Sequence, residues 1–280
     1  MAVITMHKYQ GLGNDYLVFD PNQNKITLLE RKIRLLCQRN FGVGADGILY
    51  GPLLDEGKIG VSIFNPDGSE ASGSGNGVRI FARYLRDFGY VSEKKIVITE
   101  KSKDVEVEFL DDDGRCMKVD MGKADFMRSV LSDGCSREMF NEPLMFHGNF
   151  YNTSCISLQS PNCVIMTEDV SCKHAKELGP YVENAACFPN RMNLQLCKVE
   201  SRNRLRIQIY ERGAGYTLAS GTGACAAAAA AYRMGLTERA VTVVMPGGEL
   251  GIEIGPDGTV FMTGTVKKVA TFTLAEDFFS

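Results

Sequence analysis

Histidine is scarce in this chain, and its cysteines lack the paired short spacings that zinc sites and disulfide frameworks use. Only three histidines occur among 280 residues, and the nine cysteines are an odd number. A zinc site and a disulfide framework are therefore both disfavoured. Most cysteines lie in apolar runs, where we expect small buried hydrophobic side chains. The nine are Cys37, Cys116, Cys135, Cys155, Cys163, Cys172, Cys187, Cys197 and Cys225.

Long apolar runs and an excess of one charge are also missing. No stretch reaches the roughly 20 apolar residues that a membrane helix needs, and Met1–Thr5 does not begin a secretory signal. The 31 basic and 34 acidic residues are interspersed and give a formal net charge of −3. No basic stripe is left for a phosphate backbone. We expect a cytoplasmic protein with no membrane and no nucleic acid as partner.

The pattern of apolar residues is dominated by strands. Alternation at period two, or enrichment in branched residues, predicts strands over Tyr16–Phe19, Gly60–Phe64, Lys95–Thr99, Val105–Phe109, Cys116–Met121, Cys163–Thr167, Met192–Val199, Leu205–Tyr210, Val241–Met245, Glu249–Ile254 and Val260–Thr263. Helical spacing predicts helices over Leu28–Arg39, Asn76–Asp87, Lys173–Asn184 and Gly221–Met234. The length and the 44% hydrophobic content allow two domains.

A domain boundary is expected near residue 120. Leu110–Gly114 reads as a hairpin turn, whereas Gly122–Asn149 is less regular and carries Ser, Asp, Gly and Asn clusters. We predict an N-terminal domain over residues 1–119 and a C-terminal domain over residues 120–268. A final strand within residues 269–280 is expected to return to the first domain.

A short glycine-rich motif occurs twice, with Ser74 and Ser220 146 positions apart. Each copy precedes a predicted helix and should present unpaired backbone N–H groups, with the positive end of the helix dipole, to an anion. One copy alone would more often be a glycine-rich turn with a serine N-cap, but two copies favour function. The residues at these helix starts are Ser74, Gly75, Asn76, Ser220, Gly221 and Thr222.

The two helices that follow these motifs differ in composition. In the first, Val78, Phe81, Ala82 and Leu85 form one apolar stripe that can dock on a sheet. The second is almost entirely alanine from Ala224 to Ala231, so it has no polar face. We expect this helix to be wholly buried, with its N-terminus directed at the functional surface.

Polar residues also occur in glycine-rich loops just after apolar strands, where ligand-binding groups are common. Asn14 and Asn65 lie in such loops, although either could be a turn asparagine. Glu211 and Arg212 follow another strand and could equally be a surface pair. Together with Asn193, these residues are candidates for substrate binding.

In combination these segments resemble the diaminopimelate epimerase family over nearly the whole chain. The segments that carry the resemblance are Lys8–Tyr16, Phe41–Gly47, Asn65–Ala71, Glu211–Gly215, Met245–Gly248 and Met262–Gly264, besides the two serine motifs. The resemblance implies an α/β (α+β) fold of two pseudo-symmetric domains, each a curled, mostly antiparallel sheet around a buried central helix. It also implies an active site in the cleft between the domains.

The resemblance further implies a cofactor-independent amino-acid racemase or epimerase. One cysteine thiolate removes the α-proton, and a second cysteine returns a proton on the opposite face. Aimed dipoles in a dry cleft would stabilise the carbanion-like intermediate, and a thiol near a helix N-terminus suits both proton transfers. Neither pyridoxal phosphate nor a metal is implied.

This chain departs from the family at both catalytic positions, which are occupied by Ser74 and Ser220. A serine hydroxyl is a far weaker acid than a thiol, and no histidine lies near either motif in the sequence, so we predict that the chain is nearly inactive. It could be a natural paralogue that binds without turnover, or a deliberate double replacement of cysteine by serine. The retained surroundings favour the second origin.

Other departures concern the substrate. By resemblance, Asn65, Ser160, Asn193 and Arg212 line the pocket for the far end of the substrate, and Glu211 lies near the reacting amino group. Ser160 and Asn162 replace the usual asparagine and histidine of an Asn-Pro-His sequence. Tyr216 replaces a glutamate, although it could simply pack at a strand edge. These changes favour an amino acid other than diaminopimelate, such as histidine.

The alternatives are diaminopimelate epimerase proper, a non-catalytic amino-acid-binding protein, and an isomerase of small carboxylic acids. The Glu211–Arg212 pair disfavours the last of these, because a carboxylate beside an amino group serves little purpose for a substrate without one. Apart from the amino-acid substrate, the expected partner is a second copy of the chain, since symmetric dimers are common.

Overall fold

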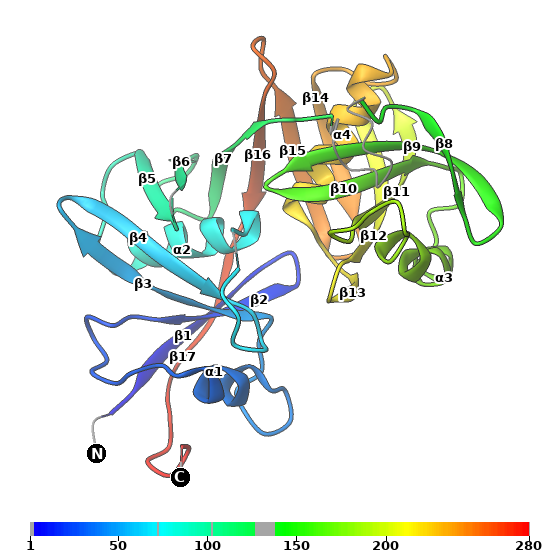
Figure 1. The fold of residues 1–280 in the computed structure, drawn as a ribbon. Coiled ribbons are helices and arrows are strands. Elements are labelled where there is room, and N and C mark those ends of the chain that lie inside the picture. Colours follow the sequence, from blue (N-terminus) through cyan, green and yellow to red (C-terminus); the bar gives the residue numbers. More distant parts are fainter. Residues whose placement is uncertain (1–2, 72, 102, 127–137, 280) are drawn as a thin grey trace. The chain divides into compact units, whose positions relative to one another are not determined.

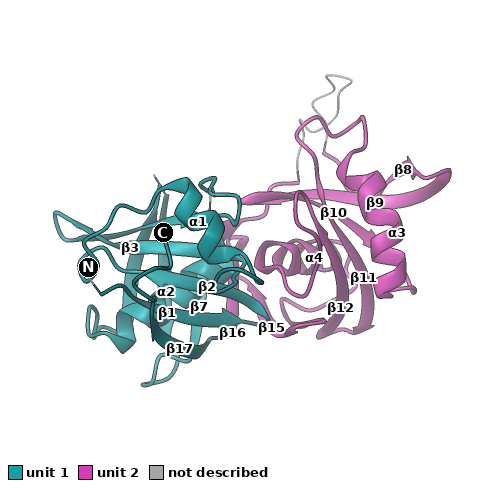
Figure 2. Ribbon diagram, turned by 90° about the horizontal axis from the view of Figure 1, so that it is seen from below, with its two compact units in different colours: residues 1–119, 264–280 teal, residues 120–263 magenta. Residues whose placement is uncertain are grey.

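The computed structural model describes residues 3–71, 73–101, 103–126 and 138–279 (Figure 1). The chain divides into two compact units, drawn in different colours in Figure 2. Unit 1 comprises Met1–Val119 and Gly264–Ser280, and unit 2 comprises Asp120–Thr263. The chain passes between them within β7 (Cys116–Lys123) and again within β16 (Thr259–Thr265).

Unit 1 is a mostly antiparallel sheet against which two helices pack. Its other elements are β1 (Thr5–Gly11), β2 (Asn14–Phe19), α1 (Glu30–Cys37), β3 (Gly47–Asp55), β4 (Lys58–Phe64), α2 (Gly75–Asp87), β5 (Lys95–Glu100), β6 (Lys103–Phe109) and β17 (Lys267–Thr273). The strands β2 and β3 pair in parallel, as do β4 and β5, and the last strand, β17, pairs antiparallel with β1. The helix α2 contacts β1, β2, β3 and β6, and its apolar stripe is fully buried.

Unit 2 has the same kind of architecture. Its elements are β8 (Glu142–Phe146), β9 (Asn149–Leu158), β10 (Ser160–Met166), α3 (Cys172–Glu183), β11 (Asn193–Ser201), β12 (Arg204–Glu211), β13 (Gly215–Thr217), α4 (Gly221–Arg233), β14 (Ala240–Met245) and β15 (Gly248–Ile254). The helix α4 contacts β9, β10, β11, β12, β14 and β15. Ala224–Ala231 are all buried, as their composition predicts, because side chains of one carbon let the strands approach the helix on every side.

The strand registers show that the two units are copies of one plan. In unit 1, Tyr16 of β2 lies opposite Gly47 of β3 in a parallel pair. In unit 2, Asn162 of β10 lies opposite Asn193 of β11, also in a parallel pair, and each of these residues follows its counterpart by 146 positions. The separation between the two serine motifs therefore extends over the strands beside them. The predicted fold of two pseudo-symmetric α/β units is confirmed.

All four predicted helices are present, but several strands were not predicted. The missed strand β3 contains Gly47, Gly51 and Pro52, which weaken a strand pattern. The strand β8 lies within the segment expected to be irregular. The predicted hairpin turn near Leu110 does join β6 and β7, which pair antiparallel.

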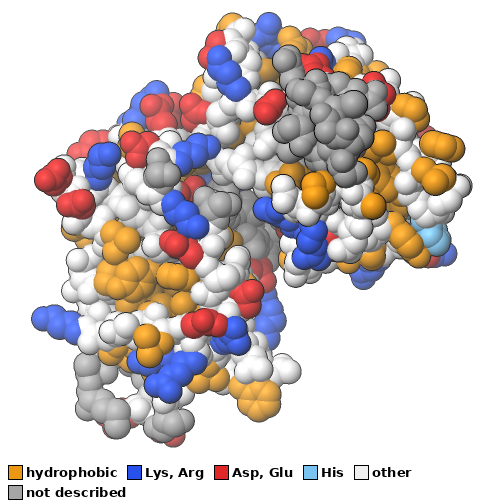
Figure 3. Space-filling view, viewed as in Figure 1, with side chains coloured by type: hydrophobic (Ala, Val, Ile, Leu, Met, Phe, Trp, Pro, Cys, Tyr) orange, Lys and Arg blue, Asp and Glu red, His pale blue; other side chains and the backbone are white. Residues whose placement is uncertain are grey.

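The surface and the cysteines agree with the composition. On the face shown in Figure 3, basic and acidic side chains are interspersed. The eight cysteines in the described ranges are free thiols, and Cys135 lies outside those ranges. In the same ranges there is no cluster of three or more metal-ligating side chains, and no helix is long and apolar enough to cross a membrane.

Candidate functional site

The two serines that the sequence singles out occupy equivalent positions, each as the N-cap of a central helix. The Ser74 Oγ accepts a hydrogen bond from the Gly77 backbone N–H at 3.0 Å, at the start of α2. The Ser220 Oγ accepts one from the Gly223 N–H at 3.3 Å, at the start of α4. Both residues have extended backbone angles, as a capping residue requires. Each serine thus lies at the positive end of a helix dipole.

In unit 1, two predicted site residues contact each other beside this helix start. The Asn76 side-chain amide donates to the Asn14 Oδ1 at 3.1 Å. The fully buried Arg79 donates to the Asn76 Oδ1 at 2.7 Å and to the Gly75 carbonyl at 3.3 Å. A buried charged donor therefore fixes the orientation of Asn76, and through it the position of Asn14.

Two further side chains contact Ser74, and neither is marked as a site residue by a sequence motif. The Tyr16 hydroxyl lies 3.3 Å from the Ser74 Oγ. The Glu100 Oε1 accepts from the Ser74 backbone N–H at 3.2 Å. Burial raises the pKa of Glu100 to about 7, against the opposing effects of the Ser74 N–H and of Lys103.

A sequence signal for Glu100 does exist. Ile96 and Ile98 of β5 point inward, and alternation at period two puts Glu100 on the same buried face. A carboxyl group at an inward position at the end of a strand is unusual enough to mark a candidate.

In unit 2, the corresponding region is a cluster of side-chain hydrogen bonds among predicted residues. The Ser160 hydroxyl donates to the Thr222 Oγ1 at 2.8 Å, which links β10 to the start of α4. The Asn193 amide lies 3.3 Å from both the Ser160 Oγ and the Asn162 Oδ1. Ser160 and Thr222 follow Asn14 and Asn76 by 146 positions, so the two units make the same strand-to-helix link with different side chains.

The loop after β12 is attached to this cluster. The Arg212 backbone N–H donates to the Asn193 Oδ1 at 2.9 Å, directly after Glu211 at the end of β12. The next N–H, of Gly213, donates to Glu183 at 2.7 Å. Glu183 is buried and also pairs with Arg191. Glu183 is not a predicted site residue, because it lies on a helix with no motif around it.

Two predicted residues lie apart from these clusters. The Asn65 amide donates to the Ser69 Oγ at 3.0 Å, which is a contact within its own turn. The Tyr216 hydroxyl donates to the Gln208 Oε1 at 2.7 Å, and its ring packs against the apolar core of unit 2. Tyr216 is therefore held against its own sheet.

The glycine three residues after each capping serine allows a close approach of a strand. A Cβ on Gly223 would lie 2.6 Å from the amide nitrogen of Gln195 on β11, and one on Gly77 would lie 3.3 Å from Leu49 on β3. Gln195 follows Leu49 by 146 positions and is fully buried. Neither its amide nitrogen nor its amide oxygen has a hydrogen-bond partner among the described residues. The two helix starts are thus equivalent in backbone and different in polarity.

Comparison with solved structures shows how widely this fold occurs. A phenazine biosynthesis protein of the PhzF family from Bacillus anthracis superposes with a TM-score of 0.71 at 14% identity, over 98% of this chain and all of that one. A hydroxyproline epimerase from Agrobacterium vitis superposes with a TM-score of 0.67 at 12% identity, over 98% and 93%. The protein therefore has the two-unit fold found in amino-acid epimerases.

Sequence comparison identifies the family. The family model described as diaminopimelate epimerase matches residues 6–127 and 154–269. The protein named diaminopimelate epimerase 2 from Nostoc sp. is 43% identical over 276 residues, which cover 98% of this chain and 96% of that protein. The chain belongs to the diaminopimelate epimerase family.

Proposed function

We propose that this protein is a cofactor-independent amino-acid racemase or epimerase that inverts an α-carbon by two-base proton transfer. Ser74 and Ser220 would stand at the positions of the two acid–base groups. The observation that carries the proposal is that both serines cap central helices in equivalent ways, within a chain of this family. The backbone N–H groups of the two helix starts would bind the substrate carboxylate.

The proposed substrate is a small amino acid bound by the polar residues of the two units. The relatives are named diaminopimelate epimerases, which favours that amino acid. Ser160, Asn162 and Tyr216 depart from the usual pattern, which favours a different side chain, such as that of histidine. We propose that Glu211 and Arg212 contact the substrate directly, together with Asn193 and Asn65. A cytoplasmic homodimer is part of the same proposal.

The two serines should make proton transfer slow. A hydroxyl gives up its proton far less readily than a thiol. We therefore expect a Ser74→Cys, Ser220→Cys double variant to exchange α-protons at least about 100-fold faster than the unsubstituted chain, within the usual range for an acid–base group. A Ser74→Ala, Ser220→Ala double variant is the matched control.

The test is α-proton exchange in deuterated buffer, followed by NMR. The double cysteine variant is incubated with single stereoisomers of diaminopimelate, histidine and other amino acids. Exchange with one of them supports the proposal and identifies the substrate. Binding of an amino acid without exchange by the cysteine variant would contradict the proposal and support a non-catalytic binding protein.

A further inference from the structure

Glu100 is a buried carboxyl group in direct contact with one of the two proposed acid–base residues. Only 3% of its surface is exposed. Its Oε1 accepts from the Ser74 N–H at 3.2 Å, and among the described residues it forms no ion pair. A buried carboxyl group without a cation partner retains its proton to a higher pH than an exposed one. Glu100 therefore needs an explanation beyond capping one N–H group.

The charged groups around Glu100 offset the effect of its burial only in part. On β6, Lys103 lies opposite Glu100 and only partly opposes the effect of burial. Lys101, the next residue in the chain, is 3.8 Å from Glu70. On β4, the residue opposite Glu100 is Val61, which is apolar. With a pKa of about 7, the carboxyl group can both accept and release a proton near neutral pH.

We propose that Glu100 accepts the Ser74 hydroxyl proton when the Ser74 oxygen removes the α-proton of a substrate amino acid. This proposal rests on the function proposed above. It assigns to a Ser74–Glu100 pair the task that a thiolate performs in the two-cysteine mechanism. Glu100 acts through Ser74 and is in this sense a positioning and proton-accepting residue.

The step balances without another reactant. The Cα–H bond breaks, and its electron pair is delocalised into the substrate carboxylate. The α-proton forms a bond with the Ser74 Oγ, while the original hydroxyl proton moves to the Glu100 carboxylate. Reprotonation of the carbon reverses both transfers. In the structure the Ser74 Oγ accepts from the Gly77 N–H and lies 3.3 Å from the Tyr16 hydroxyl, while Glu100 contacts the Ser74 backbone N–H. The transfer therefore requires the Ser74 side chain and the Glu100 carboxyl group to move into hydrogen-bond contact.

The position of unit 2 that corresponds to Glu100 carries no carboxyl group. The residue that follows Glu100 by 146 positions is Pro246, and β14 ends at Met245, which is buried and apolar. Proton abstraction by the serine-bearing chain should therefore be one-sided. We expect one stereoisomer of the substrate to exchange its α-proton faster than it is inverted.

The experiment measures α-proton exchange by the unsubstituted chain from pH 5 to 9 in deuterated buffer, with LL- and meso-diaminopimelate and with L- and D-histidine as probes. We expect the rate to rise through an inflection near pH 7, because the carboxylate is the active form. Glu100→Gln should lower the rate on the order of 100-fold and remove the inflection. The matched control is Glu106→Gln, because Glu106 lies on the neighbouring strand and is exposed.

Failure of this inference can be distinguished from failure of the proposed function. If the double cysteine variant exchanges α-protons but the unsubstituted chain does not, Glu100 has no such role while the proposed function stands. The same conclusion follows if Glu100→Gln leaves the exchange rate and its pH profile unchanged. If the cysteine variant also fails with every probe, the function itself is wrong. Independently of activity, carbon-13 NMR of glutamate-labelled protein should show one carboxyl signal, absent in Glu100→Gln, that titrates near pH 7. Titration of that signal near 4.5 would overturn the inference.

Discussion

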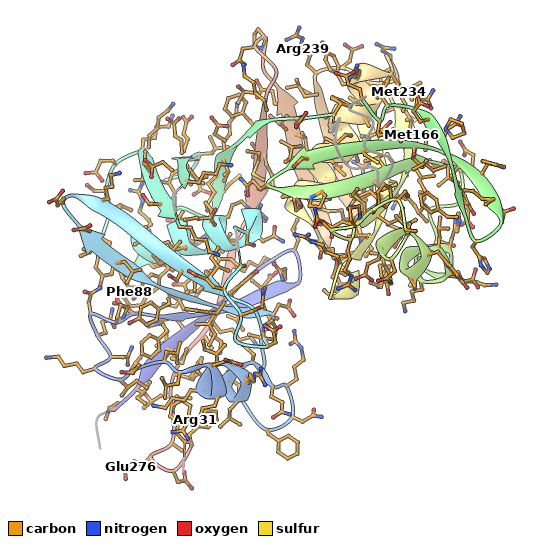
Figure 4. All side chains as sticks on the ribbon, in the orientation of Figure 1. Arg31, Phe88, Met166, Met234, Arg239 and Glu276 are labelled. Atoms are coloured by element: carbon orange, nitrogen blue, oxygen red, sulfur yellow. The ribbon has the colours of Figure 1, made fainter. Side chains whose placement is uncertain are left out.

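Two buried groups in unit 1, His7 and Glu100, should change the free energy of unfolding with pH in opposite directions. The His7 ring is 1% exposed and packs against Tyr84 and Phe88, with ring centroids at 5.3 and 4.3 Å (Phe88 is labelled in Figure 4). Burial, reinforced by Lys268, lowers the pKa of His7 from 6.5 to about 4, whereas burial raises the pKa of Glu100 from 4.5 to about 7.

The signs follow from which state binds more protons. Below pH 6.5 the unfolded chain protonates His7 and the folded chain does not, so His7 makes the free energy of unfolding rise with pH up to 6.5. Above pH 4.5 the unfolded chain loses the Glu100 proton and the folded chain retains it, so Glu100 makes that free energy fall with pH up to about 7. Each slope is about 1.4 kcal/mol per pH unit. In the unsubstituted chain the two slopes should nearly cancel between pH 4.5 and 6.5.

Single substitutions should reveal both slopes. In urea unfolding across this window, Glu100→Gln should gain about 3 kcal/mol as the pH rises, and His7→Phe should lose about 3 kcal/mol. The control is His147→Gln, which removes an exposed histidine and should keep the nearly flat dependence of the free energy of unfolding on pH that is expected of the unsubstituted chain. Carboxylates such as Asp15, whose pKa is lowered, titrate below the window. If the free energy of unfolding of Glu100→Gln varies with pH in parallel with that of the unsubstituted chain, the Glu100 carboxyl group is not buried in the way described.

Two further substitutions test a close backbone contact in unit 1 and the attachment of the loop after β12 in unit 2. A Cβ on Gly42 would lie 1.8 Å from the Leu35 carbonyl oxygen, so Gly42→Ala should lower the free energy of unfolding by about 1–3 kcal/mol. Gly60→Ala is the control, because a Cβ there would have no atom nearer than 3.4 Å, and it should cost well under half of that. Glu183→Ala leaves the Gly213 N–H without its acceptor and should lower the free energy of unfolding by about 1–3 kcal/mol. The specific readout is faster hydrogen exchange at the Gly213 amide. Unchanged exchange there would show that the loop does not depend on Glu183.

Much of the fold could be predicted because local patterns and the family resemblance agreed. The alanine run of α4 predicted its burial, and the serine motifs predicted both helix starts. The strand β3 could not be predicted, since Gly47 and Gly51 serve close packing against Tyr16 and Phe81 rather than a turn. That requirement comes from contacts between residues far apart in the sequence.

The candidate site was predicted where motifs marked it and missed where only tertiary contacts define it. Ser160 and Thr222 meet across 62 positions; Thr222 was chosen for its glycine-rich motif and Ser160 from the family resemblance. Glu100 and Glu183 have no motif, and their importance follows from burial and from the backbone N–H groups that they bind. Acidic residues at inward positions of predicted strands and helices are the signal that could have found them.

The two-base assignment of Ser74 and Ser220 is tested most directly by where solvent deuterium appears. The double cysteine variant is given one stereoisomer of its substrate in deuterated buffer, and both stereoisomers are analysed early in the reaction. Two bases on opposite faces predict deuterium in the inverted product and almost none in the recovered substrate, because one group removes the substrate proton while the other delivers a solvent deuteron. Deuterium entering the recovered substrate as fast as the product would contradict this assignment.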